Sequence, residues 1–353
     1  MIRNGFLIFF MLCGISRTLA VAPPPAAIFP QGHLLLPLAY LVQWAGGTVT
    51  PQPDNTISIA RDKHILTLTP GSRDAVADGV SFPLPCPFHE QNGLIYAPSI
   101  VFRALGIKVT RQPSEVDIEQ PWRKTWMVVH IPDPSALYPN HEQKLWALAA
   151  SALLTESNGG AHDRLNEAVP PDAAAIQIYQ KFLVKTWNIN NRTELLTALQ
   201  WLEESGDRTE FEIIGRKIRA LSDREYAALL QALQQQPDHL QQAVMARANY
   251  GPLGQAGLTG WDFARYISLC RWGYIAHYLT EQEAWTMIMP AAIRIQHAFT
   301  GWKELGQNYL IGREFFCQEL SKKDGKQFRA IQQKLSTNNN SPWLNIPWNV
   351  KLE

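Results

Sequence analysis

The pattern of hydrophobic and polar residues changes once along the chain, near residue 141. Before that point, short segments such as "TISIA" (56–60) and "ILTLT" (65–69) alternate apolar and polar residues. Alternation with a period of two is typical of half-buried strands. From His141 onward, apolar residues recur every three or four positions, which predicts amphipathic helices. The pattern therefore predicts an α+β fold, with a small N-terminal α+β module followed by a larger all-α domain.

The first part of the chain contains an internal repeat. Residues 33–50 and 93–110 resemble each other, and each copy has the pattern of a short strand, a helix and a second strand. Gly46 and Gly106 occupy equivalent positions, where a glycine is expected to end the helix. Alternating segments and turn residues between the copies predict a β meander. We expect one α+β domain over residues 28–120.

Capping patterns mark several helix starts in the second part. Asn191, Ser222 and Thr280 are each followed three residues later by a glutamate, the spacing of a capping box. The hydroxyl of Thr259 is expected to cap the next helix in the same way. Pro290 is expected to kink or break a later helix.

The remaining boundaries follow from composition. Residues 121–140 are interrupted by prolines and predict a linker with one strand at 126–131. The α-helical domain is expected over 141–320. Residues 321–353 are largely polar and are expected to form a polar tail, in which "STNNNSPW" (336–343) is expected to be loose.

The N-terminus has the pattern of a signal peptide over residues 1–20. Arg3 provides a positive start, residues 5–15 are apolar, and small residues precede Val21. The alternative is an uncleaved anchor, but the apolar run is shorter than the ~20 residues that span a bilayer. No later stretch is long and apolar enough to span one. We therefore expect an exported protein, periplasmic or secreted, without a membrane span after cleavage.

Charge and cysteine content limit the binding partners and the disulfide bonds that can be expected. Removal of Arg3 and Arg17 leaves 30 basic and 31 acidic residues, a formal net charge of −1. This balance gives no basic footprint for nucleic acid. Cys86, Cys270 and Cys317 remain after cleavage, and export permits a disulfide between two of them. Because Cys270 and Cys317 lie in apolar helical patterns, we expect buried free thiols; a Cys270–Cys317 bridge is the alternative.

The segment "GWDFARYISLCRWGY" (260–274) has the densest mixture of aromatic and charged residues. Asp262 and Arg265 can act in acid–base chemistry or orient a substrate carboxylate. We favour the other interpretation, an ion pair at the start of a helix that fixes the neighbouring helices.

Three arginines on consecutive predicted helices can likewise be interpreted as a binding site or as structural residues. Arg271, Arg294 and Arg313 can converge on an anion. We favour individual roles, in which each reaches solvent or pairs with Glu283, Glu304 or Glu314.

The candidate pocket combines these charges with neighbouring aromatic residues, for which a place in the core is the default expectation. Its members are Trp261, Asp262, Arg265, Arg271, Glu283, Trp285, Trp302, Tyr309 and Arg313. No paired metal motif, nucleophile elbow or dinucleotide loop is present in the sequence, so we expect no metal and no cofactor.

The doubled unit at 33–50 and 93–110, together with "GSRDAVADGVSFPL" (71–84), resembles the copper amine oxidase N-terminal-like domain, a module of secreted bacterial wall-associated proteins. The resemblance implies no copper chemistry here. In amine oxidases that chemistry resides in a separate domain with an Asn-Tyr-(Asp/Glu)-Tyr motif and a His-x-His pair, and this sequence has neither.

The second half carries another resemblance. The segments at 195–211, 260–274 and 296–316 occur in the same order in the bacterial family called domain of unknown function 1266, and the resemblance extends from about Trp146 to Phe316. Asp207 stands where that family usually has a histidine. The resemblance implies a domain identity and no mechanism.

Three functions remain open. The leading hypothesis is a noncatalytic binding or interaction protein of the bacterial envelope, whose partner is an envelope protein, a glycan or a small ligand. One alternative is a hydrolase or transferase that uses Asp262, Arg265 and Glu283 in a helical cleft; another is an immunity-type protein that neutralises a toxin. Convergence of these residues with Arg313 in one concave pocket would favour the enzyme, and separate pairs would count against it.

Overall fold

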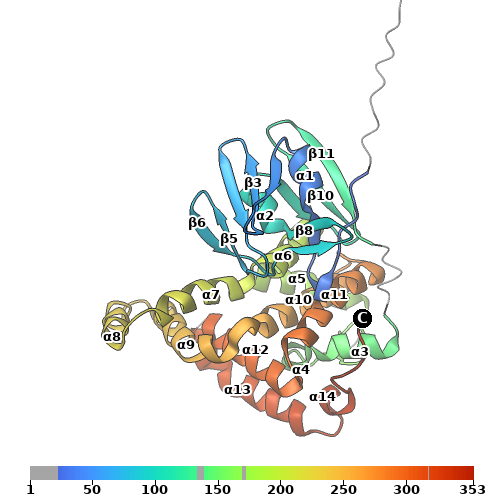
Figure 1. The fold of residues 1–353 in the computed structure, drawn as a ribbon. Coiled ribbons are helices and arrows are strands. Elements are labelled where there is room, and N and C mark those ends of the chain that lie inside the picture. Colours follow the sequence, from blue (N-terminus) through green and yellow to red (C-terminus); the bar gives the residue numbers. More distant parts are fainter. Residues whose placement is uncertain (1–22, 133–138, 169–171, 317) are drawn as a thin grey trace, which may run out of the picture.

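The computed structural model describes residues 23–132, 139–168, 172–316 and 318–353. The expected signal peptide and Cys317 lie outside these residues. Figure 1 shows the strands gathered in one part of the molecule and the helices in the other. The predicted α+β fold, with a β-rich N-terminal module and a helical C-terminal domain, is confirmed.

The sequence repeat is also a structural repeat. The first unit comprises β1 (Leu35–Pro37), α1 (Leu38–Trp44) and β2 (Thr48–Pro51), and the second comprises β8 (Leu94–Pro98), α2 (Ser99–Ala104) and β9 (Lys108–Arg111). Gly46 and Gly106 have φ values of 82° and 75°, the left-handed conformation that ends each helix. β1 pairs with β8 in antiparallel register, with Leu36 opposite Ala97. The two copies are therefore joined through their first strands.

A meander follows each unit. β2 continues into β3 (Ile57–Arg61), β4 (His64–Leu68), β5 (Asp74–Ala77) and β6 (Val80–Pro83), whereas β9 continues into β10 (Glu115–Gln120) and β11 (Thr125–His130). The short strand β7 (His89–Gln91) pairs with β8. Asp78 and Gly79 both have positive φ, as a tight hairpin between β5 and β6 requires. The strand expected within the linker is β11, and it extends the sheet of the second unit by pairing with β10.

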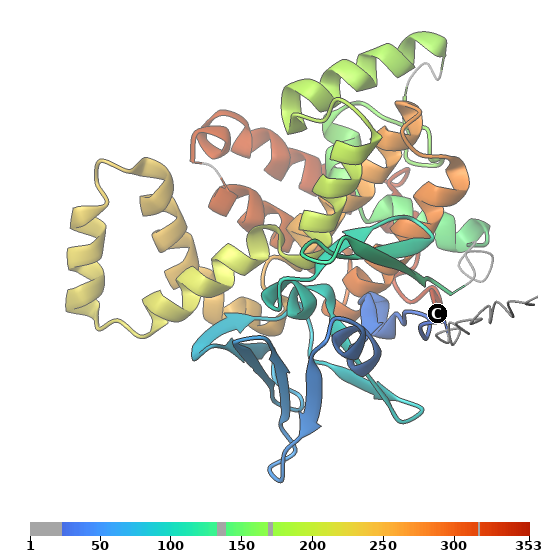
Figure 2. The ribbon, with the colours of Figure 1, turned by 90° about the horizontal axis from the view of Figure 1, so that it is seen from above.

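The helical domain is built around α10. Its helices are α3 (His141–Ala149), α4 (Ala152–Ser157), α5 (Ala173–Trp187), α6 (Arg192–Glu204), α7 (Gly206–Arg219), α8 (Asp223–Ala232), α9 (Pro237–Leu253), the short η3 (Gly254–Ala256), α10 (Thr259–Ile275), α11 (Glu281–Ala298), α12 (Trp302–Phe316), α13 (Gln318–Thr337) and α14 (Pro342–Asn345). Nearly every residue of α10 is buried, and it packs against α6, α11 and α12. In Figure 2, the segment from α7 to α9 reaches away from the rest of the bundle. Within the described ranges, no helix combines the length and the apolar character needed to cross a membrane.

The capping predictions have mixed outcomes. Asn191, Ser222 and Thr280 each accept a hydrogen bond from the backbone three residues ahead, as expected. The prediction for Thr259 is wrong, because this residue is already the first of α10 and Leu258 precedes it without a side-chain cap. Pro290 lies inside α11, which continues to Ala298, so the helix does not break there, and the alternative of a kink stays a prediction.

The prediction of a loose polar tail is also wrong. α13 and α14 occupy most of residues 318–345, and α13 places Phe328, Ile331 and Leu335 in the core. Three apolar residues at helical spacing are enough to dock an otherwise polar helix. Trp343 is 5% exposed, and its indole N–H donates to the carbonyl of Ala149 over 2.9 Å. The C-terminal residues thus belong to the helical domain.

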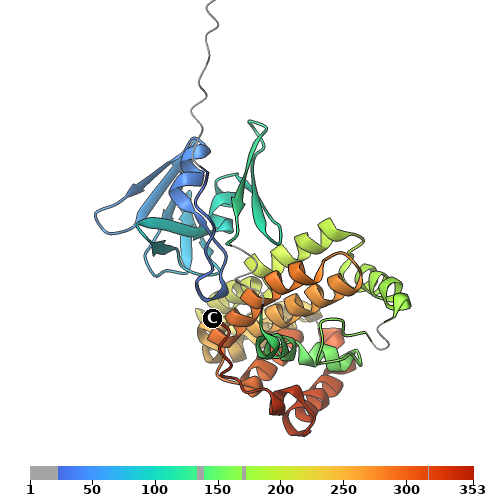
Figure 3. The same cartoon turned by 90° about the vertical axis from the view of Figure 1, so that its right-hand side faces the viewer.

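The module rests on one side of the helical domain, as Figure 3 shows. The short helix η1 (Pro30–Gly32) packs on α11, and α6 packs on β9. Gly32 has a φ of 76°, and a Cβ added there would lie 2.2 Å from the carbonyl oxygen of Pro290. The Ser99 hydroxyl donates to Glu204 over 2.6 Å, and the Gln200 amide donates to the carbonyl of Val109 over 2.9 Å. Close packing and buried polar contacts therefore hold the domains together.

The packing of α14 against the helical domain leads to a prediction about stability. Trp343→Ala is expected to lower the free energy of unfolding by about 3–5 kcal/mol, because a buried indole and its hydrogen bond are lost. Leu344→Ala is the matched control, since the neighbouring Leu344 side chain is 50% exposed. Urea denaturation of both variants measures the difference. Equal, small losses would contradict the packing of α14.

Candidate functional site

Asp262 lies in the first turn of α10, yet its carboxylate caps a different helix. The side chain is fully buried, and its two oxygens accept hydrogen bonds from the backbone N–H groups of Asp207 and Arg208, each over 3.1 Å. These two donors are at the N-terminus of α7, where unpaired N–H groups favour an anion. Gly206 has a φ of 56°, and a Cβ added there would lie 2.1 Å from the Asp262 carboxylate. The approach of the two helices therefore requires glycine at position 206.

Four charged side chains meet at this junction. Arg265 donates to the carboxylates of Asp207 and Asp262 over 2.7 Å each, and Arg208 donates to Asp262 over 2.9 Å. The Trp261 indole donates to Asp207 over 2.6 Å. Burial raises the pKa of Asp207, and the charge of Arg265 opposes that shift. The expected Asp262–Arg265 ion pair is present, within a cluster of two acids and two bases whose formal charges balance.

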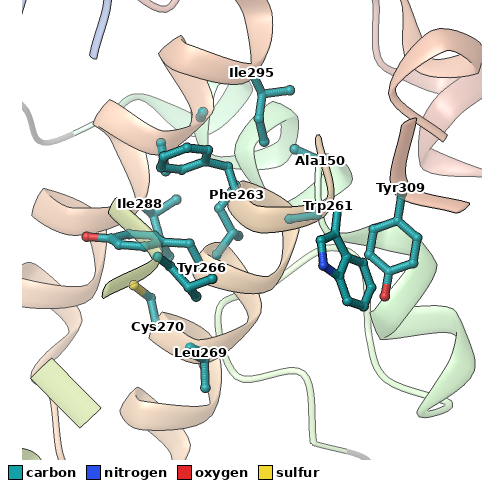
Figure 4. Packing of buried hydrophobic residues seen from close by; sticks show 14 of the residues in the cluster. Ala150, Trp261, Phe263, Tyr266, Leu269, Cys270, Ile288, Ile295 and Tyr309 are labelled. Carbon is teal, nitrogen blue, oxygen red and sulfur yellow. The ribbon is translucent and has the colours of Figure 1, made fainter. Parts of the chain in front are cut away.

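Aromatic rings surround the Arg265 guanidinium. Its central carbon lies 4.0 Å from the centre of the Trp261 ring, 5.6 Å from Trp187 and 5.9 Å from Trp201. Cation–π attraction adds to the ion pairs at this distance. Figure 4 shows Trp261 beside Tyr309, and their ring centres are 5.0 Å apart in an edge-on arrangement. Trp261, Tyr309 and Arg265 thus form part of the core.

Arg271 occupies a separate buried site. It pairs with Glu167 over 3.1 Å, and both side chains are fully buried. It also donates to the Thr155 hydroxyl over 2.6 Å and to the carbonyl of Ala161 over 2.7 Å. The expected partners, Glu283, Glu304 and Glu314, are wrong for this arginine. Glu167 lies in an irregular segment after α4, whose position in space the helical pattern did not reveal.

The other candidate residues are dispersed. Glu283 forms two hydrogen bonds with Arg192, over 2.8 and 3.1 Å, at the partly exposed start of α11. Trp285 and Trp302 are buried in the core, as the default interpretation expected. Arg313 is also buried and lies 4.2 Å from the centre of the Phe328 ring. The nine residues do not gather in one cavity: Asp262 and Arg265 lie in one cluster, and Arg271, Glu283 and Arg313 lie elsewhere.

Two adjoining cavities lie where the module meets the helical domain. The larger measures about 410 Å³ and the smaller about 240 Å³. We call this pair the interdomain pocket; the residues common to both cavities are Arg73, Pro85, Arg208, Gln255, Ala256 and Thr259. None of the nine candidate residues lines either cavity. The pocket is therefore a different candidate site.

The smaller cavity has a distinctive lining. Arg73, Arg208 and Arg294 line it together with His33 and Cys86, and no aspartate or glutamate occurs among the lining residues that the structure describes. Of these residues, Arg294 and Cys86 are noticeable in the sequence, but nothing in the sequence places them side by side. The chain positions of Arg73 and Arg208 lie far apart, and no local motif indicates that they meet.

The histidine and the cysteine of this cavity are uncharged at neutral pH. Burial raises the pKa of the Cys86 thiol to about 11. Burial and the nearby charge of Arg294 hold the pKa of His33 well below its usual value. Cys86 and Cys270 are both buried free thiols, whereas the alternative bridge from Cys270 to Cys317 involves a residue outside those that the structure describes. The cavity therefore presents arginine charge beside neutral groups.

Metal donors do not gather in the part of the chain that the structure describes. No group of three or more His, Cys, Asp or Glu side chains there is arranged to hold a metal ion. A copper site is therefore not built from the described residues of the module.

Comparison with known proteins defines the two domains. Residues 17–119 match the copper amine oxidase N-terminal domain, and residues 183–348 match the family described as protein of unknown function (DUF1266). The chain thus carries a copper amine oxidase N-terminal domain followed by a DUF1266 domain, and both resemblances inferred from the sequence are confirmed.

Two relatives come from Escherichia coli K12, and each is described as an uncharacterized protein. YbeU is 24% identical over 225 residues, which cover 59% of this chain and 92% of YbeU. YbeR is 23% identical over 134 residues, which cover 38% of this chain and little more than half, 56%, of YbeR. No solved structure matches the chain significantly. These relationships identify the domains but assign no function, so a function has to be inferred from the geometry of the site.

The charge cluster predicts a large effect of removing Asp262. Asp262→Ala is expected to lower the free energy of unfolding by about 3–5 kcal/mol, because Arg208 and Arg265 then share one carboxylate and α7 loses its cap. Asp163→Ala is the control, since Asp163 is 73% exposed and pairs only at the surface with Arg164. Its expected loss is below about 1 kcal/mol. Unfolding curves in guanidinium chloride measure the free energy of unfolding of both variants. If Asp262→Ala loses as little stability as the control, a structural role of the cluster is contradicted.

Proposed function

We propose that this chain is an exported, noncatalytic binding protein of the bacterial envelope, and that its ligand site is the interdomain pocket. The observation that carries the proposal is that both domains supply the walls of one concave site. The module contributes the segment around Arg73 and Pro85, and the helical domain contributes the starts of α7 and α10. Small-molecule sites occur preferentially at such domain junctions.

Contacts across the junction support a preformed site. The Arg73 guanidinium donates to the carbonyl of Gln255 in the helical domain and to that of Pro85 in the module, each over 2.9 Å. Arg216 of α7 pairs with Asp74 of β5 over 2.7 Å. A site whose walls are already fixed loses less entropy when a ligand binds.

The groups in the pocket favour retention of a ligand over its transformation. A reactive cysteine needs a thiolate, whereas the Cys86 thiol is protonated at neutral pH because its pKa is raised to about 11. Among the described residues that line the larger cavity, the one acidic side chain is Glu212, which pairs with Arg216 over 2.6 Å and accepts from the Tyr250 hydroxyl over 2.9 Å. The concave shape favours a small ligand over a protein partner.

Export is the second element of the proposal, and the signal-peptide pattern of residues 1–20 supports it. When the full chain is expressed in a bacterial host, we expect it in the periplasmic or secreted fraction, with its N-terminus near Val21. Cell fractionation and mass spectrometry of the intact protein measure both. Recovery in the cytoplasm with residues 1–20 retained would refute export and would leave the binding site to be judged separately.

Obstruction of the pocket tests the binding role. Immobilised full-length protein is expected to retain a small molecule from an envelope extract, detected by mass spectrometry of the eluate. Ala256→Trp places an indole at a position that lines both cavities and is expected to abolish retention. Ala227→Trp is the matched control, because Ala227 is exposed on α8, away from the pocket. Undiminished retention by Ala256→Trp, or no retention by the unmodified protein, would refute the proposed site.

A further inference from the structure

The interdomain pocket has an excess of positive charge. Two of the arginines that line it have a carboxylate partner: Arg208 shares the balanced cluster with Asp262, and Arg216 pairs with Asp74 over 2.7 Å. Glu203 and Glu204 of α6 are paired with arginines of the module that line neither cavity, Arg111 and Arg103. Among the described residues, neither Arg73 nor Arg294 forms an ion pair with an aspartate or glutamate, and both line the smaller cavity.

Of these two arginines, Arg294 provides the stronger evidence for an anion-binding site. It is 6% exposed, and among the described residues its guanidinium donates to the carbonyl of Glu203 over 3.1 Å, contacts the His33 ring and lies 4.4 Å from the centre of the Phe263 ring. Burial lowers the pKa of Arg294 to about 9, and repulsion from Arg208 contributes to the shift. Proteins rarely bury a charge without a partner, because desolvation then costs several kcal/mol. An arginine in this setting is therefore expected to have an anionic partner that comes from outside the chain.

A helix start faces the same space. Thr259, the first residue of α10, lines both cavities, and Leu258 before it provides no side-chain cap. The N–H of the second residue, Gly260, donates to the Asn308 side chain of α12 over 2.9 Å. α10 has 17 residues, so its first turn carries a substantial partial positive charge. Gly254 and Gly257 on the approach to the helix have φ values of 52° and 49°, and a Cβ at either position would meet nothing within 4 Å. The backbone at this entrance therefore leaves open space.

The donors approach the smaller cavity from three elements. Arg73 comes from the module, Arg294 from α11 and Thr259 from α10. Arg73 is held in place by the carbonyls of Gln255 and Pro85. Donors in three directions match the tetrahedral oxygens of a phosphoryl group better than the plane of a carboxylate. His297 at the rim contacts Glu353 over 3.3 Å, and this acid does not line the cavity.

The two cavities differ in a way that suggests how a larger ligand would lie. The smaller one, about 240 Å³, has room for a phosphoryl group. The adjoining one, about 410 Å³, is lined by Tyr250, Leu84 and Pro83 as well as by polar residues, and can hold an uncharged body. We propose that the interdomain pocket binds a small phosphate monoester, with its phosphoryl group between Arg73, Arg294 and the start of α10. This inference rests on the proposed function, because it assigns a ligand class to the same pocket.

Isothermal titration calorimetry of the full-length protein tests this assignment with inorganic phosphate and glucose 6-phosphate as ligands. Both are expected to bind, and uncharged glucose is expected not to bind at the same concentrations. Arg294→Gln and Arg73→Gln are each expected to weaken phosphate binding about tenfold to a hundredfold, through loss of a charge-assisted hydrogen bond. Arg329→Gln is the matched control, because Arg329 is 56% exposed on α13 and pairs with Glu314. Its affinity is expected to equal that of the unmodified protein.

The fold of each variant is checked by its thermal unfolding without phosphate. Arg294→Gln is expected to unfold at or above the temperature of the unmodified protein, because it removes a buried charge that lacks a carboxylate partner. If Arg294→Gln nevertheless fails to fold, Arg73→Gln at its half-buried position decides the result.

Several outcomes would overturn the inference. They are no binding of either phosphate compound, equal weakening by Arg329→Gln, or tighter binding of the planar dianion malonate than of phosphate. If envelope material is retained by the unmodified protein and lost in Ala256→Trp while phosphate does not bind, only the ligand class is refuted. If both retention and phosphate binding are absent, the proposed function fails as well.

Discussion

The carboxylate of Asp262 is the contact on which the arrangement of the helical domain depends. It closes the N-terminus of α7 and pairs with Arg208 and Arg265, and its own side chain is fully buried. In this way the central helix α10 sets the direction in which α7 leaves the bundle. The same contact orients Arg208 toward the module, where it joins Arg73 and Arg294 around the interdomain pocket. Because Asp262 pairs with Arg208, the arginines of the pocket that are left without a carboxylate partner among the described residues include Arg73 and Arg294.

The internal repeat explains how the module reaches this junction. Each strand–helix unit is followed by a meander, and the longer meander carries Arg73 immediately before β5. The second unit supplies Ser99 and Arg111, which contact α6. Both copies therefore contribute to the interface, although they do so with different residues. The asymmetry between the five-stranded and three-stranded sheets leaves the segment from Arg73 to Pro85 beside the start of α10.

Local signals predicted much of the fold, because they act within a few residues. The repeat, the turn at Asp78 and Gly79, and the caps at Asn191, Ser222 and Thr280 each depend on neighbours in sequence. The partners of the charged residues could not be predicted in the same way. Arg271 pairs with Glu167, and Glu283 pairs with Arg192, in each case across a long stretch of chain. The sequence offers several oppositely charged residues as partners for each of them. The polar composition of residues 321–353 hid the few apolar positions that dock α13.

The pairing of β1 with β8 has a consequence for how the module folds. Each copy of the repeat places its first strand against the other copy, so neither copy alone completes the hydrogen bonds of that strand. Contacts that close over such a long stretch of chain carry an entropic cost before they are rewarded by burial. We therefore expect neither half of the module to be stable without the other, and the module to fold as one cooperative unit once β1 and β8 have paired.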